Sequence, residues 1–414
     1  MNNDGVATAW PPMVRAFSYR NFRLLFAGQL LSTIGTWIQN LALSWLVFKL
    51  TQSPAMLGLT SFANQFPGFL LAPLTGMVAD RFDRRKVMFA SELLSFALAF
   101  LLAILTLTHQ VQIWQILTIG ALLGAAASFE IPARHALVSE IVARSDLSNA
   151  IALSSTIFNT SRIIGPAIAG VLVVLVGEGW CFMINAASFL PIMISVLLLR
   201  MEPRQRAQLT GNIIGAITEG FRYFAATPPL RYTVISTIGL SLFGNLFTTL
   251  LPVFAANILQ GGADTLGILM GSAGFGALCG ALILASRRGH GGLIRWVGFG
   301  TIGIGALLVA FSLSSQLYFS VPLLACVGAS WVFASTSANT LFQSLAPDEL
   351  RGRAVSIYLM IMMGGTPLGG LMGGTVAELA GAPLALGGAG AICCLIGIWY
   401  QRKMARTPVD LAAS

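Results

Sequence analysis

The densest run of charge in the chain is Gly76-Met-Val-Ala-Asp80-Arg81-Phe-Asp83-Arg84-Arg85-Lys86-Val87. Six of these twelve residues are ionisable, whereas Asp, Glu, Lys and Arg together make up only 9% of the 414 residues. Almost wholly apolar segments flank the run on both sides. Because such a cluster cannot lie in hydrocarbon, we expect it to form a tight, water-facing turn between two membrane helices.

The composition of the whole chain is typical of a polytopic membrane protein. Hydrophobic residues make up 56% of it and the mean hydropathy is +0.80, whereas soluble domains carry roughly 25% charged residues. The net charge of +9 lies at predicted helix ends, which indicates membrane topology and not a nucleic-acid partner. The polar stretch 1–18 lacks an apolar core, so we expect no cleavable signal peptide.

A membrane-spanning helix needs about 20 mostly apolar residues. By that measure the sequence predicts an all-α membrane protein with twelve spanning helices, at residues 24–48, 56–78, 87–107, 113–131, 151–176, 181–199, 232–254, 266–284, 293–313, 318–341, 354–377 and 383–400. The single long polar connection follows the sixth span. We therefore expect an N-terminal segment at 1–20, six-helix halves at 21–200 and 231–401, a central loop at 201–230 and a tail at 402–414.

The positions of Lys and Arg predict the orientation. If the N-terminus is cytoplasmic, 22 of the 24 Lys and Arg residues fall on the cytoplasmic side. The exceptions are Lys49, which lies outside, and Arg162, which lies within a span. We therefore expect a multi-pass protein of the cytoplasmic (inner) membrane whose termini, central loop and charged turn at 76–87 are all cytoplasmic.

The two halves resemble each other at an offset near 203 residues. Arg84-Arg85 falls on Arg287-Arg288, Asp146-Leu147 falls on Glu349-Leu350, and Gly170 falls on Gly373. Six predicted spans on each side of the central loop agree with a duplication. Two such halves, related by an axis along the membrane normal, are the arrangement of alternating-access transporters.

The charged turn resembles a signature of the major facilitator superfamily, which that superfamily carries between its second and third helices. The matching residues are Gly76-x-x-x-Asp80-Arg81-x-x-Arg84-Arg85. Further stretches resemble the enterobactin-exporter and macrolide-efflux branch: 31–40, 131–134, Arg162-Ile-Ile-Gly165-Pro166 and 345–353. The resemblance covers essentially the whole chain. The second-half copy keeps Arg287-Arg288 but has Cys279 and Ile283 at the Gly and Asp positions.

The resemblance implies that the start of the eleventh helix lies opposite the turn. Our hypothesis is a conformational latch in which Asp80 contacts that helix start when the cytoplasmic side is shut, because an anion is favoured near a helix N-terminus. The latch residues are Gly76, Asp80, Arg81, Arg84, Arg85 and Arg353. The alternative is a solvated turn that obeys the positive-inside rule, which explains the arginines but not the Gly and the Asp.

Only Glu92, Glu130 and Arg162 lie well within predicted spans, where each would cost roughly 2.5–3.5 kcal/mol if it faced lipid. A pair of Glu130 with Arg162 would make Glu130 a proton site, ionised while paired and protonated when separated. The alternative is a structural ion pair, with Arg134 as the partner of Glu130 four residues on. We expect Glu92 to belong to the charge network of the turn.

Polar and aromatic residues at mid-depth predict a substrate cavity. Aromatic rings with a few amides suit a bulky amphipathic solute, and the alternative for about half of them is hydrogen bonding between helices. The candidates are Trp37, Gln39, Asn40, Asn245, Phe247, Trp331 and Asn339. The glycine runs 165–170 and 364–374 are expected to be close-packing surfaces.

These features together predict a secondary active transporter and not an enzyme. We expect alternating access and proton-coupled efflux, by antiport, of a small hydrophobic or amphipathic solute, drug-like or siderophore-like. The alternatives are a lipid or lysolipid translocator of the same fold and a membrane scaffold that does not transport. We expect a monomer in the lipid bilayer, with protons as the coupling ion and without a cofactor, a metal or a nucleic-acid partner, because no metal-ligand spacing or phosphate-binding loop is present.

Overall fold

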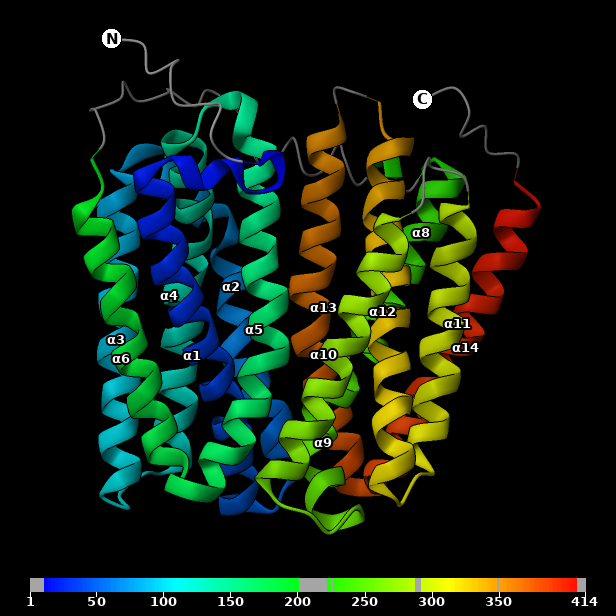
Figure 1. Ribbon diagram of the computed structural model, residues 1–414. Coiled ribbons are helices and arrows are strands. Elements are labelled where there is room, and N and C mark those ends of the chain that lie inside the picture. Colours follow the sequence, from blue (N-terminus) through cyan, green and yellow to red (C-terminus); the bar gives the residue numbers. More distant parts are fainter. Residues whose placement is uncertain (1–10, 201–221, 225, 287–291, 348–349, 408–414) are drawn as a thin grey trace. The chain divides into compact units, whose positions relative to one another are not determined.

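The computed structural model of the chain describes residues 11–200, 222–224, 226–286, 292–347 and 350–407. The described part is helical and contains no strand (Figure 1). The predicted central loop lies mostly outside the described residues, as do Arg287-Arg288 and Glu349. The all-α architecture predicted from hydropathy is confirmed.

Contacts divide the chain into two units. Unit 1 contains Met1–Leu43 and Leu70–Thr210, and unit 2 contains Ser44–Phe69 and Gly211–Ser414. Residues 44–69, which include the end of the first long helix and the start of the second, thus belong with the helices of the second half. The boundary between the units therefore runs through the first two long helices, Arg20–Thr51 and Pro54–Arg81.

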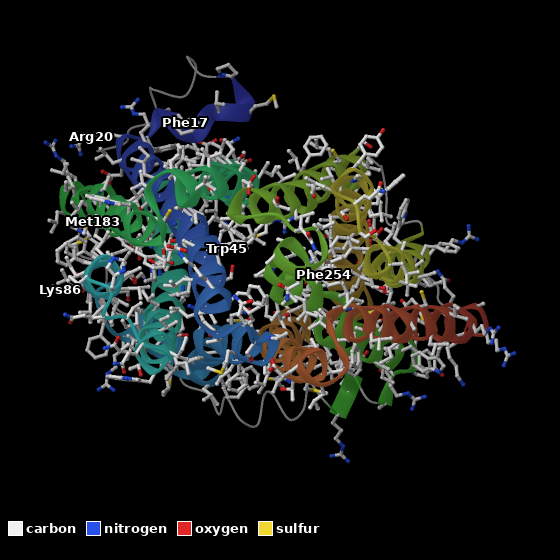
Figure 2. All side chains as sticks on the ribbon, turned by 90° about the horizontal axis from the view of Figure 1, so that it is seen from below. Phe17, Arg20, Trp45, Lys86, Met183 and Phe254 are labelled. Atoms are coloured by element: carbon white, nitrogen blue, oxygen red, sulfur yellow. The ribbon has the colours of Figure 1, made fainter. Side chains whose placement is uncertain are left out.

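The helices of the first half follow one another with short connections. They are η1 (Pro12–Ser18), α1 (Arg20–Thr51), α2 (Pro54–Arg81), α3 (Arg84–Leu107), α4 (Ile113–Ile141), η2 (Arg144–Asp146), α5 (Leu147–Val176) and α6 (Glu178–Leu198). In unit 1, α3 packs against both α4 and α6, and Figure 1 shows these helices side by side. Figure 2 shows Arg20 and Lys86, both exposed, at the outer edge of this unit.

The helices of the second half include one interrupted span. They are α8 (Pro228–Gly239), η3 (Leu240–Gly244), α9 (Leu246–Val253), η4 (Phe254–Ile258), α10 (Ala263–Ala285), α11 (Leu293–Ser312), α12 (Leu317–Leu345), α13 (Arg351–Ala380) and α14 (Ala382–Ala405). In unit 2, α11 packs against α12 and α14, and α10 packs against α12.

Eleven helical stretches in the described part are long and apolar enough to cross a membrane. The helix at the remaining predicted span is α2, whose 28 residues would extend about 42 Å. Several helices continue beyond their apolar runs. For example, α4 ends at Ile141, ten residues after the predicted span. Hydropathy detects only the part of a helix that suits hydrocarbon.

The seventh predicted span is not one regular α-helix. Two π-helical segments, η3 and η4, interrupt it, and Asn245 between η3 and α9 has φ −98° and ψ 0°. π-Helical turns inside membrane helices often occur at functional sites. The predicted span at 232–254 lies within the helical stretch Pro228–Ile258, and the two π-helical segments are a local feature of that stretch.

Equivalent turns in the two halves support the duplication. Gly177 joins α5 to α6 with φ +84°, and Gly381 joins α13 to α14 with φ +88°. Both positions have a positive φ that glycine adopts without strain. Each is also the residue that ends one helix and begins the next, so the same one-residue turn occurs in both halves.

Glycines set the closest helix contacts in unit 2. A Cβ on Gly276 would lie 1.7 Å from the carbonyl oxygen of Ala325, and one on Gly328 would lie 1.9 Å from that of Ala273. The helices α10 and α12 therefore touch backbone to backbone. Small residues at such crossings are typical of membrane helices, where association depends on close packing.

Candidate functional site

The charged turn is short and capped. Between α2, which ends at Arg81, and α3, which begins at Arg84, Asp83 accepts a hydrogen bond from the backbone N–H of Arg85 at 2.9 Å. A carboxylate in this N-cap position satisfies one of the free N–H groups of the helix and complements its dipole. Asp83 is thus a structural residue of the turn that the sequence analysis did not identify.

Arg84 and Arg85 of the turn connect three helices of unit 1. The guanidinium of Arg84 contacts the carboxylate of Glu140 on α4. Nη2 of Arg85 donates to the carbonyl oxygens of Val196 and Leu197 on α6, at 3.1 and 3.2 Å. Unpaired carbonyls at a helix C-terminus favour such a cation. These arginines therefore fix the ends of α4 and α6 in addition to their part in the charge balance of the turn.

The proposed latch partners fall in different units. Gly76 lies on α2 in unit 1, and a Cβ built there meets none of the described atoms within 4 Å. Arg353 lies in the first turn of α13 in unit 2. The side chain of Asp80 lies outside the described residues. The latch therefore stays a prediction.

Inside unit 1, charged side chains gather between α3 and α4. Nε of Arg134 lies 2.9 Å from Oε1 of Glu130, one turn away on α4. Glu92 on α3 is 3% exposed, and its carboxyl interacts electrostatically with Glu130 and Arg134. The three side chains therefore form one electrostatic group, and we call Glu92, Glu130 and Arg134 the charge cluster.

The ion pair in the charge cluster is poorly directed. Neither Nε of Arg134 nor Oε1 of Glu130 has a hydrogen-bond partner with acceptable angles among the described residues, although the two atoms are only 2.9 Å apart. Hydrogen bonds weaken steeply when the N–H points away from the acceptor. Charge attraction, more than a directed hydrogen bond, thus holds the pair. Moving Arg134 away from Glu130 therefore costs less than breaking a well-aligned ion pair.

A small hollow adjoins Arg134. It is formed by α1, α4 and α5 and is lined by Phe22, Leu25, Phe26, Gln29, Arg134, His135, Val138, Ser154 and Ile157. His135 interacts electrostatically with both Arg134 and Glu130. Polar groups from three helices therefore face the same space on one side of the charge cluster.

The sequence allowed two partners for Glu130, and the structure places Arg134 beside it. Among the described residues Arg162 makes no ion pair, so the alternative of a Glu130–Arg162 pair is not formed. Glu92, expected in the network of the turn, interacts with Glu130 and Arg134 instead. Both differences depend on the rotation of each helix about its axis, which spacing along the chain does not determine.

Some of the predicted cavity residues hold helices together. Gln39 is 4% exposed, and its Oε1 accepts a hydrogen bond of 2.8 Å from Asn185 on α6. Gln39 thus takes the helix-bonding role, whereas Asn40 beside it is exposed. Trp37 packs on Gly165 of α5, where an added Cβ would lie 2.4 Å from the Cβ of Trp37.

The candidates in the second half lie on the interrupted span and on α12. The backbone carbonyl of Asn245 accepts from the Thr248 hydroxyl at 2.8 Å, and Phe247 is 5% exposed. Trp331 is half-buried, and its ring lies 3.4 Å from a Cβ built on Gly244. Asn339 is also half-buried and accepts from Gln343 at 3.2 Å. Phe247 is therefore a core residue, while the other three keep some exposure.

A carboxylate closes one end of unit 2. Oε2 of Glu378 on α13 accepts from the Ser53 hydroxyl at 2.7 Å and from the Ala55 N–H at 3.2 Å, at the N-terminus of α2. Further along the same two helices, Gly58 and Gly370 are in close contact: a Cβ added to Gly58 would lie 2.5 Å from the carbonyl oxygen of Gly370. The glycine run 364–374 is thus a packing surface. We call the contact of Glu378 with Ser53 and Ala55 the α2–α13 clasp.

The segment before α1 is fastened to the α4–α5 connection. Tyr19 donates to Asp146 at 2.8 Å, and Nε of Arg15 lies 3.4 Å from the same carboxylate. Burial, followed by the hydrogen bond to Asp146, raises the pKa of Tyr19 above its usual value of 10.0. The phenol therefore stays a hydrogen-bond donor throughout the neutral pH range.

Comparison with known proteins identifies the family. A family model described as a transmembrane secretion effector (MFS_3) matches residues 7–412. The chain belongs to the major facilitator superfamily. The chain is thus a multi-pass membrane transporter of small molecules and not an enzyme, as the charged turn and the helix count predicted.

Relatives within the superfamily include exporters. The chain is 25% identical over 395 residues to the staphyloferrin A transporter of Staphylococcus aureus, and the match covers 92% of this chain and 96% of that one. It is 26% identical to the multidrug efflux pump Tap of Mycolicibacterium fortuitum, covering 86% and 89%. It is 24% identical to macrolide efflux protein A of Streptococcus pyogenes, covering 88% and 92%.

Solved structures show the same fold at low identity. A bacterial homologue of the human lysosomal transporter Spinster, in an inward-facing and unoccupied conformation, matches with a TM-score of 0.74 at 14% identity and covers 94% of this chain and 98% of that one. A mutant of the peptide transporter POT matches with a TM-score of 0.77 at 11% identity, covering 94% and 95%. The major facilitator fold is confirmed.

Proposed function

We propose that this major facilitator protein exports a small hydrophobic or amphipathic solute across the cytoplasmic membrane in exchange for protons. Both termini lie in the cytoplasm in this proposal, in accordance with the positive-inside rule. Export is supported by the relatives named as efflux proteins, among them Tap and macrolide efflux protein A. Alternating access is the mechanism expected of two related six-helix halves.

The charge cluster is the observation that carries the proposal of proton coupling. Ionisable side chains inside membrane helices are costly and commonly form proton relays. Here Glu130 pairs with Arg134, and the carboxyl of Glu92 interacts electrostatically with both of them. One added proton leaves one carboxylate for one cation, whereas its loss leaves two like charges close together. With one proton bound, the cluster carries no net charge. Release of that proton leaves a net charge of about −1 in it, so the cluster can hold and release one proton.

Arg134 is the group that would link the proton to the substrate. Its ion pair with Glu130 is poorly directed, and the adjoining hollow offers polar neighbours such as Gln29 and Ser154. Displacement of the guanidinium from Glu130 would leave the carboxyl without its partner and favour its protonation. A solute or a helix movement that displaces Arg134 would then change proton binding.

The latch is the second part of the proposal. Gly76 and Asp80 on α2 would meet the start of α13, near Arg353, when the cytoplasmic side is shut. The close contact would depend on the small Gly76, which has open space around its Cα in unit 1. Asp80→Asn should then weaken the closed cytoplasmic state in a conformational probe assay, and an unchanged inward/outward balance would remove the latch from the account.

Transport in proteoliposomes tests the proposed function. The purified full-length protein is reconstituted and offered a panel of drugs, organic acids and lysolipids, with and without an imposed pH gradient. We expect saturable movement of at least one amphipathic solute that the gradient drives uphill. Movement of lysolipids alone would favour the lipid translocator, and no saturable movement of any solute would favour the scaffold.

A further inference from the structure

Arg162 lies at the midpoint of α5. The helix runs from Leu147 to Val176, so Arg162 is about 22 Å from the Leu147 end at 1.5 Å per residue. A hydrocarbon layer of about 30 Å therefore leaves Arg162 near its centre. A cation at that depth is costly unless water, a protein anion or a ligand anion satisfies it.

The protein does not supply that anion within its described part. Glu130 is bound by Arg134 at 2.9 Å, and Glu92 lies beside the same pair. No hydrogen bond or ion pair of the Arg162 side chain occurs among the described residues. The guanidinium, with five N–H donors, is thus left for a group that is not part of the described chain.

The side of α5 opposite Arg162 is suited to lipid. Ile164, Ile168, Val171 and Leu175 recur at spacings of three and four residues and are 41%, 40%, 54% and 72% exposed. At about 100° per residue, this aliphatic stripe lies on the far side of the helix from Arg162. Arg162 therefore points away from this lipid-suited stripe, and its side chain is half-buried.

The side of α5 that carries Arg162 changes character at this residue. Towards the Leu147 end, Ser155 and Phe158 on this side are exposed. Towards the Val176 end, the same side is closed, because Gly165 and Ala169 are buried. On this side of α5, Arg162 therefore lies where the exposed part ends and the buried part begins. A solute that moved along α5 from the Leu147 end would stop there.

An aromatic surface lies one turn away from Arg162 on the same side. Phe158 is 52% exposed, and its ring centroid lies 5.9 Å from that of Trp37 on α1. The close contact of Trp37 with Gly165 holds the indole against α5. A cation next to two rings matches a solute with one acidic group and an apolar body.

We propose that Arg162 is the binding site for the anionic group of an amphipathic organic acid, whose apolar part lies against Phe158 and Trp37. The proposal rests on the proposed export function and names its substrate class. It assigns Arg162 to the substrate and the charge cluster to the proton. Neutral and cationic solutes would lack the contact with Arg162.

A matched pair of probes tests this site. Dansylglycine and its methyl ester share one scaffold and differ in the carboxylate. Their binding to the full-length protein in phosphatidylcholine nanodiscs is followed by dansyl fluorescence, with empty nanodiscs as the blank. The variants are Arg162→Gln, Arg162→Lys, which keeps the charge, and Arg402→Gln, an exposed arginine near the end of α14. The melting temperature of each variant shows whether it is folded.

We expect the wild type to bind the acid at least about tenfold more tightly than the ester. Arg162→Gln should abolish this preference, Arg162→Lys should retain part of it, and Arg402→Gln should leave it unchanged. Equal affinities in the wild type, no binding of either probe, or a preserved preference in Arg162→Gln would overturn the site. If Arg162→Gln does not fold, Arg162→Lys decides. A partly reduced preference supports the site, and a preference equal to that of the wild type overturns it, because an ammonium cannot replace the two parallel hydrogen bonds that a guanidinium donates to a carboxylate.

Transport separates this inference from the function on which it rests. The proposed export function fails if wild-type proteoliposomes move no solute in response to a pH gradient. The anion site fails alone if gradient-driven transport occurs but Arg162→Gln changes acid and ester transport equally.

Discussion

Removal of Arg134 should destabilise unit 1, because it leaves Glu92 and Glu130 together without a cation. Breaking a buried ion pair by removing one partner costs about 3–5 kcal/mol. Here the side chains of Arg134 and Glu130 are 20% and 15% exposed, and the pair is poorly directed. We therefore expect Arg134→Gln to lower the free energy of unfolding by about 2–3 kcal/mol, because partial hydration reduces the cost.

The measurement is a titration with sodium dodecyl sulfate in dodecyl maltoside micelles, followed by far-UV circular dichroism. Arg144→Gln is the matched control, because Arg144 is exposed in η2. The double variant Glu130→Gln/Arg134→Gln should recover at least half of the loss, since it removes one of the two carboxylates. A loss in Arg134→Gln no larger than in Arg144→Gln would refute the reasoning, as would additive losses in the double variant.

Three further predictions concern contacts within the units. Gln39→Leu or Asn185→Leu alone should cost about 1–3 kcal/mol, because each leaves a buried amide unpaired, and the double variant should cost less than the two together. Arg85→Ala should lower the free energy of unfolding by about 1–2 kcal/mol, because it removes the donor to two α6 carbonyls, and Arg85→Lys should lower it by less. Glu378→Gln should weaken the α2–α13 clasp by about 1 kcal/mol and raise the labelling rate of a cysteine placed at Ala55, whose backbone N–H donor is kept.

Each of these predictions has an outcome that would contradict it. Strictly additive losses for Gln39 and Asn185 would show that the two amides do not depend on each other. An Arg85→Ala variant as stable as the wild type would show that the α6 carbonyls are satisfied without it. Unchanged labelling of a cysteine at Ala55 in Glu378→Gln would show that the α2–α13 clasp does not protect this end of α2.

The spans could be predicted from the sequence because the bilayer imposes one length and one polarity on every crossing. The charged turn at 76–87 was located for the same reason, and its Gly76–Asp80 spacing also pointed to the family. The interruption at Leu240–Gly244 could not be predicted, because its apolar residues suit an α-helix and a π-helix equally well.

The partners of polar side chains were harder to predict. Glu130 had two candidates at acceptable spacing, and only the rotation of α4 and α5 decides between Arg134 and Arg162. Asn185 lies in an apolar run, and nothing in its sequence context marks it as the partner of Gln39. The partner of Arg84 could have been predicted. Glu140 follows the fourth predicted span on the cytoplasmic side, and the charged turn that contains Arg84 is predicted on that same side.

The proton site at Glu92 and Glu130 is the central claim, and one comparison tests it most directly. Proteoliposomes with wild-type protein or the Glu92→Gln/Glu130→Gln variant are assayed for two activities with the same solute, namely uphill accumulation driven by a pH gradient and exchange at equal pH on both sides. Our account predicts that the variant loses gradient-driven accumulation and keeps exchange. Gradient-driven accumulation at the wild-type rate in the variant would contradict it.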